Sequence, residues 1–441
     1  MAPTAESLAP LALAYLERQP WFGLAIAGLA PAPAALLSYS VLRDGRPGLA
    51  RLLVGRGERR FQLLVGWRNP AAVAGMLGGR EEAIIGSADD GGEDVLVYEA
   101  LADDTLALEL LDLATQGAEH AERVRHVSTL VSHASLVFDD RLFMKCYRVL
   151  EPGVRPEVEA MLRLDSVGFN AMLAPIAAWR AEGFDVALVR EFLPGALEGR
   201  LLALTSLRDL LARAAEVREA SGAPAEDLEE ATSATGGDLA SEMRRLGAMT
   251  GSLHLALAAA FGDRVATPEA LAAIVAAGCG EGLERLERAR SLVGAIAALE
   301  PGTTGRAIRL HGDYHLRRVM RAEPGWVVAG FSDDPLYASR RPHTSLPART
   351  GSPLEDVADM CFSLRQVARE AAQLRPSDEA ELAEALAGAW ARRNQEAFLE
   401  GYRAAPGIDR LLPGHPAAAG LLLEAFALVR DRRYEASPAE G

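Results

Sequence analysis

The segment HGDYH at residues 311–315 places two histidines, a glycine and an aspartate close together. It closes the run 306–314, whose apolar residues predict a short strand, so Asp313 is expected in a loop after that strand. A carboxylate held there can accept a proton from an attacking hydroxyl, and Gly312 permits a tight backbone. The HxDxH spacing could also suit zinc, but no further His or Cys lies nearby. The segment therefore favours a catalytic base over a metal site.

A second candidate is Lys145, which lies in the apolar strand pattern LFMKCY directly after a turn. Phosphoryl transfer needs a cation on the nucleotide phosphates, a carboxylate at the acceptor hydroxyl and ligands for magnesium. Glu157 and Glu159 open the next predicted helix, and either could pair with Lys145, preferably Glu159. Taken alone, Lys145 also fits a surface position on an edge strand, and the glutamates suit the positive end of a helix dipole.

The elements that must position these residues divide the chain into a strand-rich part and a helical part. A helix is predicted at about 5–18, followed by short strands at 34–42, 49–55 and 60–68 and a helix within 96–120. Further strands are predicted at 135–138 and 141–150 and as a pair within 173–193, with a helix at 156–169. The remaining helices are predicted at 201–220, 239–261, 268–297, 353–374, 377–405 and 415–435, with an exposed connection at 221–237 and a strand at 326–331. A small strand-rich lobe followed by a large helical lobe is the outline of a bilobal kinase.

Composition narrows the function classes. The net charge of −15 over 441 residues disfavours general binding to nucleic acid or to an anionic membrane. Cys146, Cys279 and Cys361 have no CxxC spacing and are expected to be buried thiols in a reducing compartment. The first residues lack a signal-peptide pattern, and no apolar stretch approaches ~20 residues. We therefore expect a cytoplasmic protein.

A series of motifs resembles the maltokinase family and is similar to the related actinobacterial glucosamine kinases, which are aminoglycoside-phosphotransferase-like kinases. The motifs occur in the family's order, with gaps, from about residue 15 to 435: YLERQPWFG, VFDDRLFMKCYRVLEPGVRPEVE, VREFLPG, LTSLRDL, MRRLGAMTGSLHLALAAAFG, RLHGDYHLRRVM and SPLEDVADM. The resemblance implies an α+β, bilobal protein-kinase-like (aminoglycoside phosphotransferase-like) fold. It also implies an N-terminal cap subdomain at 1–95, a strand-rich N-lobe with the nucleotide-site lysine at 96–195, and a helical C-lobe with the HGDYH loop at 196–441.

The same resemblance implies roles at matching positions. Lys145 would hold the phosphates of ATP, Glu159 would pair with it, and Ser135 with its neighbours would belong to the phosphate-covering loop. Beside the adenine, a hinge would bond the base through its backbone, and the catalytic base would lie in the C-lobe. The hinge residues would be Glu191, Phe192 and Leu193, and the base would be Asp313.

Two positions depart from the family pattern. Arg318 stands where the family has a glutamine that helps to hold magnesium, and a guanidinium cannot ligate a metal. Gly330 stands where the family has the aspartate that is its main magnesium ligand. Mg²⁺ prefers a nearly octahedral shell of hard oxygens, and Asp333 or Asp334 could supply one only from a rebuilt loop. The sequence therefore predicts degenerate metal positions and doubtful Mg²⁺ binding, with Arg318 neutralising phosphate directly.

Two functions follow from these observations. The first is a maltokinase-like pseudokinase that holds a nucleotide without magnesium and regulates a protein partner, such as an active kinase or an enzyme of α-glucan metabolism. The alternative is an active kinase with an atypical metal site, which transfers phosphate from ATP to maltose, giving maltose 1-phosphate, or to glucosamine or another sugar. A different nucleotide-dependent transfer on the same fold is a third option.

Overall fold

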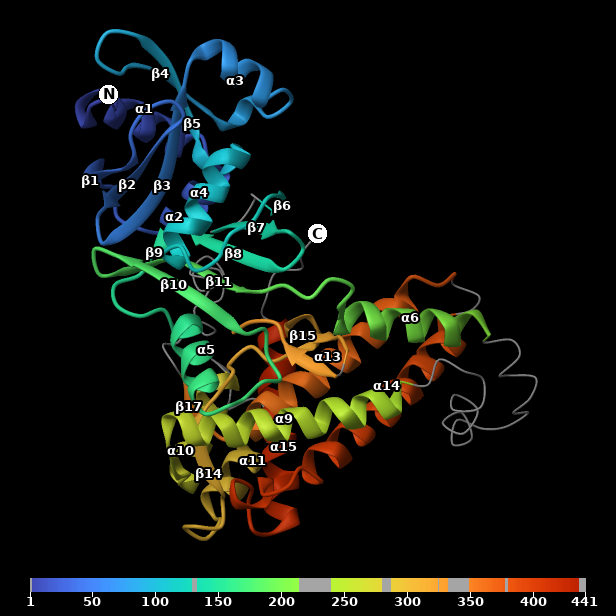
Figure 1. Cartoon of the computed structure of the whole chain (residues 1–441). Coiled ribbons are helices and arrows are strands. Elements are labelled where there is room, and N and C mark those ends of the chain that lie inside the picture. The colour runs from blue at the N-terminus through green and yellow to red at the C-terminus, as the bar shows by residue number, and fades with distance from the viewer. Residues whose placement is uncertain are drawn as a thin grey trace. The chain divides into compact units, whose positions relative to one another are not determined.

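A computed structural model describes residues 2–128, 133–213, 239–279, 287–323, 325–331, 349–376 and 380–435 (Figure 1). The described chain forms two compact units. One comprises the chain up to Met161 together with Ala174–Pro194, and the other comprises Leu162–Leu173 and the described chain from Gly195 onward. Within the described ranges, no helix is both long enough and apolar enough to cross a membrane.

The first unit begins with a sheet of strand order β1-β2-β3-β5-β4. Its strands are β1 (Ala34–Arg43), β2 (Gly48–Arg56), β3 (Arg59–Arg68), β4 (Ile84–Asp89) and β5 (Asp94–Glu99). Helix α1 (Ala5–Glu17) starts where the Thr4 side chain accepts a hydrogen bond from the Ser7 N–H at 3.2 Å. Its residues Leu8 and Tyr15 are buried against this sheet. The short helices α2 (Pro20–Ile26) and α3 (Pro70–Met76) follow α1 and β3 in the chain.

The second sheet of this unit has five strands in the order β10-β11-β8-β7-β6. They are β6 (Val124–Ser128), β7 (His133–Phe138), β8 (Leu142–Tyr147), β10 (Pro175–Ala181) and β11 (Phe184–Glu191). Helix α4 (Asp104–Thr115) buries Leu106 and Leu110 in a core shared with Met144 and Val189. Because side chains alternate along a strand, Phe143, Lys145 and Tyr147 lie on the face of β8 opposite to Met144. Four of these strands were predicted from the sequence, at 135–138, at 141–150 and as a pair within 173–193, and β6 was not.

The two sheets of this unit are joined through the strand that carries Lys145. After β8, the short strand β9 (Val149–Leu150) pairs with β3 of the first sheet. Gln62 on β3 is buried, and its Nε2 donates hydrogen bonds to the carbonyl oxygens of Tyr147 at 3.0 Å and Val186 at 3.1 Å. These contacts fix the position of β8 and β11 relative to the first sheet.

The second unit is mainly helical. Its helices are α6 (Gly199–Ala212), α9 (Ala240–Phe261), α10 (Pro268–Cys279), α11 (Glu287–Ala297), α13 (Leu354–Gln373), α14 (Ala380–Arg403) and α15 (Pro416–Glu435). Helices α9 and α14 run side by side and approach closely at glycines (Figure 1). A Cβ at Gly401 would lie 1.9 Å from the Arg244 carbonyl oxygen, and one at Gly247 would lie 2.0 Å from that of Phe398. Any larger residue at either glycine would push the helices apart.

Two small sheets complete this unit. One has the order β13-β14-β17 and contains β13 (Asp263–Val265), β14 (Arg306–Arg309) and β17 (Thr350–Gly351). The other has the order β12-β15-β16 and contains β12 (Leu197–Glu198), β15 (Val319–Arg321) and β16 (Trp326–Val328). Because β14 leads into the HGDYH segment and β15 follows it, these sheets hold both ends of that loop.

The observed elements match the predicted α+β pattern, with three points of detail. The helix predicted at 268–297 is described as α10 and α11, with 280–286 outside the described residues. The connection predicted at 221–237 also lies outside them. The division of the chain near residues 95 and 195 stays a prediction, and β5, which crosses the first of these positions, is hydrogen-bonded into the first sheet.

Candidate active site

The loop that carries Asp313 is fixed by Asp356 in the first turn of α13. One carboxylate oxygen of Asp356 accepts the His311 N–H at 2.8 Å, and the other accepts the Gly312 N–H at 3.0 Å. Gly312 has a φ of +85°, which an L side chain rarely adopts, so this turn requires glycine. Asp356 is buried, and the pair of backbone bonds holds the loop in one conformation.

Asp356 is in turn held by a buried polar chain that reaches α9 and α14. The His254 Nε2 lies 3.4 Å from an Asp356 oxygen, and the His254 Nδ1 lies 2.9 Å from the Tyr402 hydroxyl. Burial works to raise the pKa of Asp356, but His254, His311 and the loop N–H outweigh it and hold that pKa below its usual value. Asp356 is therefore a buried carboxylate that stays ionised.

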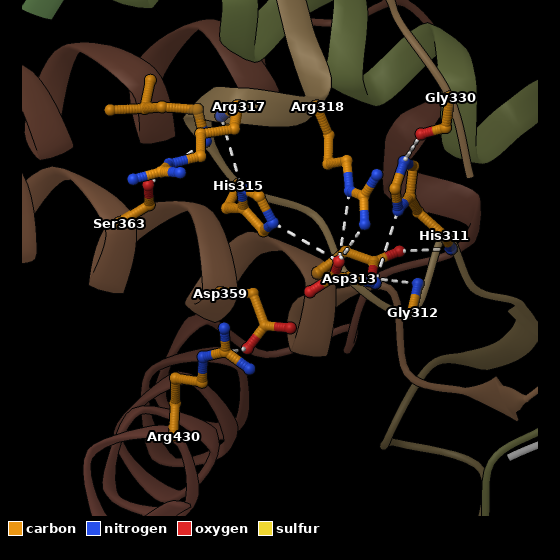
Figure 2. A network of polar contacts seen from close by, with 12 residues as sticks. His311, Gly312, Asp313, His315, Arg317, Arg318, Gly330, Asp359, Ser363 and Arg430 are labelled. Atoms are coloured by element: carbon orange, nitrogen blue, oxygen red, sulfur yellow. Dashed lines mark hydrogen bonds and ion pairs between the residues drawn. The ribbon is translucent and has the colours of Figure 1, made fainter. Parts of the chain in front are cut away.

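The side chain of Asp313 is engaged by two neighbouring basic residues. Arg318 directs Nε (3.1 Å) and Nη2 (2.8 Å) at one carboxylate oxygen, and the His315 Nε2 lies 3.3 Å from the same oxygen. Figure 2 shows both side chains pointing toward Asp313. The His315 Nδ1 accepts the Arg317 N–H at 3.2 Å, so the proton of a neutral His315 is on Nε2, where it can be donated to Asp313.

These contacts determine the protonation of Asp313. Burial alone would raise the pKa of Asp313, but His315 and the Arg318 guanidinium together hold it well below the ordinary value. A general base works best when its pKa lies near the working pH. In this arrangement Asp313 is a stable carboxylate and a weak proton acceptor.

The first histidine of the motif, His311, is a neutral structural residue. Its Nε2 donates to the Gly330 carbonyl oxygen at 2.9 Å, and its Nδ1 accepts the Asp313 N–H at 3.4 Å. The ring stacks on Phe331 with centroids 4.8 Å apart. His311 and His315 therefore point at different groups, and the described residues contain no cluster of three His, Cys, Asp or Glu side chains that could hold a metal.

Burial lowers the pKa of His311 to about 4, and this predicts how stability depends on pH. In the unfolded chain a histidine takes up a proton near pH 6.5, whereas the folded chain does so only near pH 4. The His311 contribution to stability is therefore complete above pH 6.5 and is lost as the pH falls toward 4. The free energy of unfolding in urea should be measured at pH 7 and at pH 5. Over this interval it should fall by about 2 kcal/mol less in His311→Gln than in the parent.

The control for this experiment is His120→Gln, because the His120 side chain is 77% exposed. That variant should follow the pH dependence of the parent chain. An unchanged pH dependence in His311→Gln would mean that His311 already accepts a proton in the folded protein near pH 6.

The two predicted metal positions do not fit Mg²⁺, which a kinase of this type requires. Arg318 brings a guanidinium to the Asp313 carboxylate. Gly330 has no side chain, and its carbonyl oxygen accepts the His311 N–H. Asp333 and Asp334, the alternative ligands, lie outside the described residues. The Arg318 guanidinium, which we expected to face phosphate, binds the candidate base instead.

Lys145 forms an ion pair with Glu157, the alternative to the preferred Glu159. The Lys145 Nζ lies 2.6 Å from the Glu157 Oε2, which also accepts a hydrogen bond from the Tyr147 hydroxyl at 3.2 Å. Both glutamates lie in the first turn of α5 (Pro156–Ser166). Residues two positions apart in a helix point about 200° away from each other around its axis. Only one of the two glutamates can therefore face β8. Glu157 is the buried one, and Glu159 is partly exposed.

Ser135 lies in a strand and not in a loop. It is a buried residue of β7, directly opposite Lys145 of β8 and Ser128 of β6 in the sheet register. Residues 129–132 lie outside the described residues. The strand predicted at 135–138 is confirmed as β7, which begins two residues earlier at His133, and the role of Ser135 in covering phosphates stays a prediction.

The predicted hinge follows β11. The N–H of Glu191 donates to the Ala174 carbonyl oxygen at 2.8 Å, and the N–H of Phe192 donates to that of Arg141 at 2.8 Å. These two donors are therefore used within the protein. A nucleotide base bonded by this backbone must use Leu193 or carbonyl oxygens.

A polar pocket that sequence reasoning missed adjoins the loop of Asp313 in the second unit. Its empty volume is about 320 Å³, including its opening to solvent. It contains two ion pairs, Arg349 with Glu355 and Arg430 with Asp359, the latter at 3.5 Å. The lining residues are Leu310, Gly312, Arg349, Glu355, Asp356, Asp359, Phe426, Val429 and Arg430. Its charged residues come from α13, α15 and the residue before β17, which only the fold brings together.

Comparison with known proteins gives three findings. Residues 15–103 match the maltokinase N-terminal cap domain. A glucosamine kinase of Streptacidiphilus jiangxiensis is 29% identical over 272 residues, which are 57% of this chain and 55% of that protein. The match thus spans about half the length of this relative.

Solved structures of glucosamine kinase share the fold. One, in complex with glucosamine, ADP and inorganic phosphate, has a TM-score of 0.60 and 22% identity, covering 98% of this chain and 94% of that chain. A second crystal form has a TM-score of 0.57 and 21% identity, covering 98% and 95%. The predicted fold class is therefore confirmed.

Proposed function

We propose that this chain, whose cap domain is of the maltokinase type and whose fold is that of glucosamine kinase, is a pseudokinase that binds a nucleotide without magnesium. The observation that carries the proposal is the ion pair between Arg318 and Asp313, in which two guanidinium nitrogens lie 2.8 and 3.1 Å from one carboxylate oxygen. Transfer of phosphate to a hydroxyl would need this carboxylate as a base, and the guanidinium opposes that role.

The charge balance at the site also disfavours a metal ion. A magnesium ion bound at Asp313 would lie close to the Arg318 cation, and Coulomb repulsion between them would weaken binding. Gly330 occupies the position at which the family has the aspartate that is its main magnesium ligand. Arg318 therefore replaces one function of the metal, the neutralisation of negative charge, without providing its bridging geometry.

Retention of a nucleotide is supported by Lys145. It is the only lysine in the chain, whose other permanently cationic side chains are arginines. A compact ammonium ion differs from a planar guanidinium in the way it binds phosphate. A single lysine, ion-paired with the buried Glu157 at 2.6 Å, supports a specific role on the phosphates of ATP.

The charged residues that line the pocket beside Gly312 support a second ligand. Its carboxylates and guanidiniums can bind hydroxyl groups, and Phe426 with Val429 gives it an apolar wall. One glucosamine kinase structure contains glucosamine, ADP and inorganic phosphate together. We extend this pairing to the present chain as part of the proposal, with the liganded form regulating an active kinase or an enzyme of α-glucan metabolism.

The test combines labelling with turnover. An acyl-phosphate derivative of ADP transfers its acyl group to a lysine beside the bound phosphates, and here only Lys145 can be the labelled lysine. We expect labelling of Lys145, detected by peptide mass spectrometry, to be equal in Mg²⁺ and in EDTA and to be suppressed by excess ATP. With maltose or glucosamine, ADP release should not exceed that of Asp313→Ala.

Two variants serve as controls for the labelling. Lys145→Arg should remove it, and Arg123→Met, which alters an 80% exposed side chain of the same unit, should not change it. Labelling that requires Mg²⁺, or sugar-dependent ADP release well above the Asp313→Ala background, would refute the pseudokinase.

The second candidate is an active sugar kinase with an atypical metal site. It is favoured by the intact loop, in which Asp356 still accepts the backbone N–H groups of His311 and Gly312. The Arg318 side chain is 31% exposed and could leave Asp313 when substrates bind. Magnesium-dependent turnover of a single sugar would distinguish this candidate.

A further inference from the structure

The face of the second sheet that carries Lys145 also carries an unusual pair, Arg190 and Phe143. Arg190 on β11 lies directly opposite Phe143 on β8 in the antiparallel register. The guanidinium carbon of Arg190 is 4.4 Å from the centroid of the Phe143 ring. Both side chains are half-buried, in contrast to Met144 and Val189, which are fully buried on the α4 side. The pair therefore forms a flat, charged platform on the Lys145 face.

The charge of Arg190 is not compensated by a direct partner within the described part of the chain. There, its side chain makes the contact with Phe143 but no hydrogen bond or ion pair. Burial lowers the pKa of Arg190 to about 10, against the attraction of Glu157 and Tyr147, so the group stays charged at neutral pH. Glu157 itself is engaged by Lys145 at 2.6 Å. A half-buried charge without a partner is costly unless a ligand supplies one.

The position of Arg190 on the sheet indicates which part of a ligand it would meet. Leu188, two residues before Arg190, is the residue opposite Lys145. With a rise of about 3.4 Å per residue, Arg190 lies about 7 Å along the strand from Lys145. The displacement is toward Glu191, where β11 ends. If Lys145 binds phosphates, as the proposed function requires, Arg190 lies at the base end of the nucleotide.

We propose that Arg190, held by Phe143, is a specificity-determining residue that selects guanine over adenine nucleotides. An arginine can donate two parallel hydrogen bonds to O6 and N7 of guanine, both of which are acceptors. Adenine offers N7 but presents an amino donor at position 6, which opposes the guanidinium N–H groups. Stacking on Phe143 restricts the guanidinium to one plane, which reduces the ordering cost of binding.

The experiment measures binding of GDP, IDP and ADP to the full chain by titration calorimetry, with EDTA and without sugar. IDP has the same O6 and N7 as guanine but lacks the 2-amino group. GDP and IDP are expected to bind at least about tenfold more tightly than ADP, which is the discrimination expected of one bidentate contact. Arg190→Met should reduce this ratio to about one, and Arg190→Lys, which lacks the fork, should restore little of it.

Controls separate recognition from folding. Arg123→Met should keep the parental ratio, and each variant should show the parental thermal midpoint to within a few degrees. Phe143→Leu keeps the cation and removes the platform, so it should weaken the preference without abolishing it.

Three results would overturn the inference: ADP binding as tightly as GDP, tight binding of GDP but not IDP, or an unchanged ratio in Arg190→Met. Failure of the parent chain to bind any of the three nucleotides would overturn it as well. Because the titration involves no turnover, magnesium-dependent kinase activity would refute the pseudokinase and leave the base preference standing. Equal binding of the three diphosphates would refute the base preference and leave the pseudokinase standing.

Discussion

The double variant Gly330→Asp with Arg318→Gln is expected to release ADP in the presence of Mg²⁺ and a sugar at least about tenfold faster than the parent chain. Removing the Arg318 guanidinium takes away the two contacts at 2.8 and 3.1 Å that stabilise the Asp313 carboxylate. The pKa of Asp313 should then rise toward its ordinary value, because a neighbouring cation no longer favours the ionised form. General-base catalysis of this kind contributes roughly 10²–10⁴-fold, so even partial recovery is measurable.

Both changes are needed, since each restores a different oxygen ligand. Arg318→Gln supplies a carboxamide oxygen where a cation stood, and Gly330→Asp supplies the carboxylate that Mg²⁺ prefers. Each single variant should therefore release ADP at a rate close to that of the parent. Coupled ADP-release assays with maltose and with glucosamine measure all three variants.

The matched control is Arg317→Gln, because Arg317 is exposed and directs its backbone N–H, not its side chain, to His315. Adding Asp313→Ala to the double variant should return the rate to background. If the double variant binds nucleotide but stays inactive, loss of the metal ligands is not what silences the chain, and the acceptor pocket must differ as well. If the parent already releases ADP as fast as the double variant, the active-kinase alternative is established.

Much of the scaffold could be predicted because its elements are long and periodic. The strand that carries Lys145, the strands β7, β10 and β11 of the same sheet, and helices such as α9 and α13 follow from apolar spacing alone. The resemblance to maltokinase and glucosamine kinase, deduced from ordered motifs, is confirmed by the cap-domain match and the glucosamine kinase relative. The loop character of HGDYH was also correct, since β14 ends at Arg309 just before it.

What could not be predicted depends on contacts between distant residues. The choice of Glu157 over Glu159 is decided by which side of α5 faces the sheet, and a short helix with acids at both positions does not reveal it. The binding of Arg318 to Asp313 requires the turn at Leu316–Arg318 that brings the two side chains together. Strands of two or three residues, such as β12 and β15, are too short for any periodicity to be detected.

The largest expected loss of stability is that of Asp356→Asn. The two carboxylate oxygens of Asp356 accept the N–H groups of His311 and Gly312 at 2.8 and 3.0 Å, and His254 lies 3.4 Å away. An asparagine has a single acceptor oxygen, so its amide nitrogen must face one of the two backbone donors. Asp356, His254 and His311 are buried in the second unit, where an unsatisfied N–H costs about 1–3 kcal/mol and breaking a buried charged contact costs about 3–5 kcal/mol.

Urea unfolding at pH 7 should therefore give a free energy of unfolding about 3 kcal/mol lower for Asp356→Asn than for the parent. The matched control is Asp359→Asn, one turn later on the same helix, where the side chain is 16% exposed and lies 3.5 Å from Arg430. That pair, at 3.5 Å, should contribute less to stability than the shorter contacts of Asp356. Equal losses in the two variants would mean that α13 as a whole, and not the hold of Asp356 on the catalytic loop, determines the effect. A loss confined to Asp356→Asn, together with weaker protection of the His311 and Gly312 amides from hydrogen exchange, would place the cost in the loop that positions Asp313.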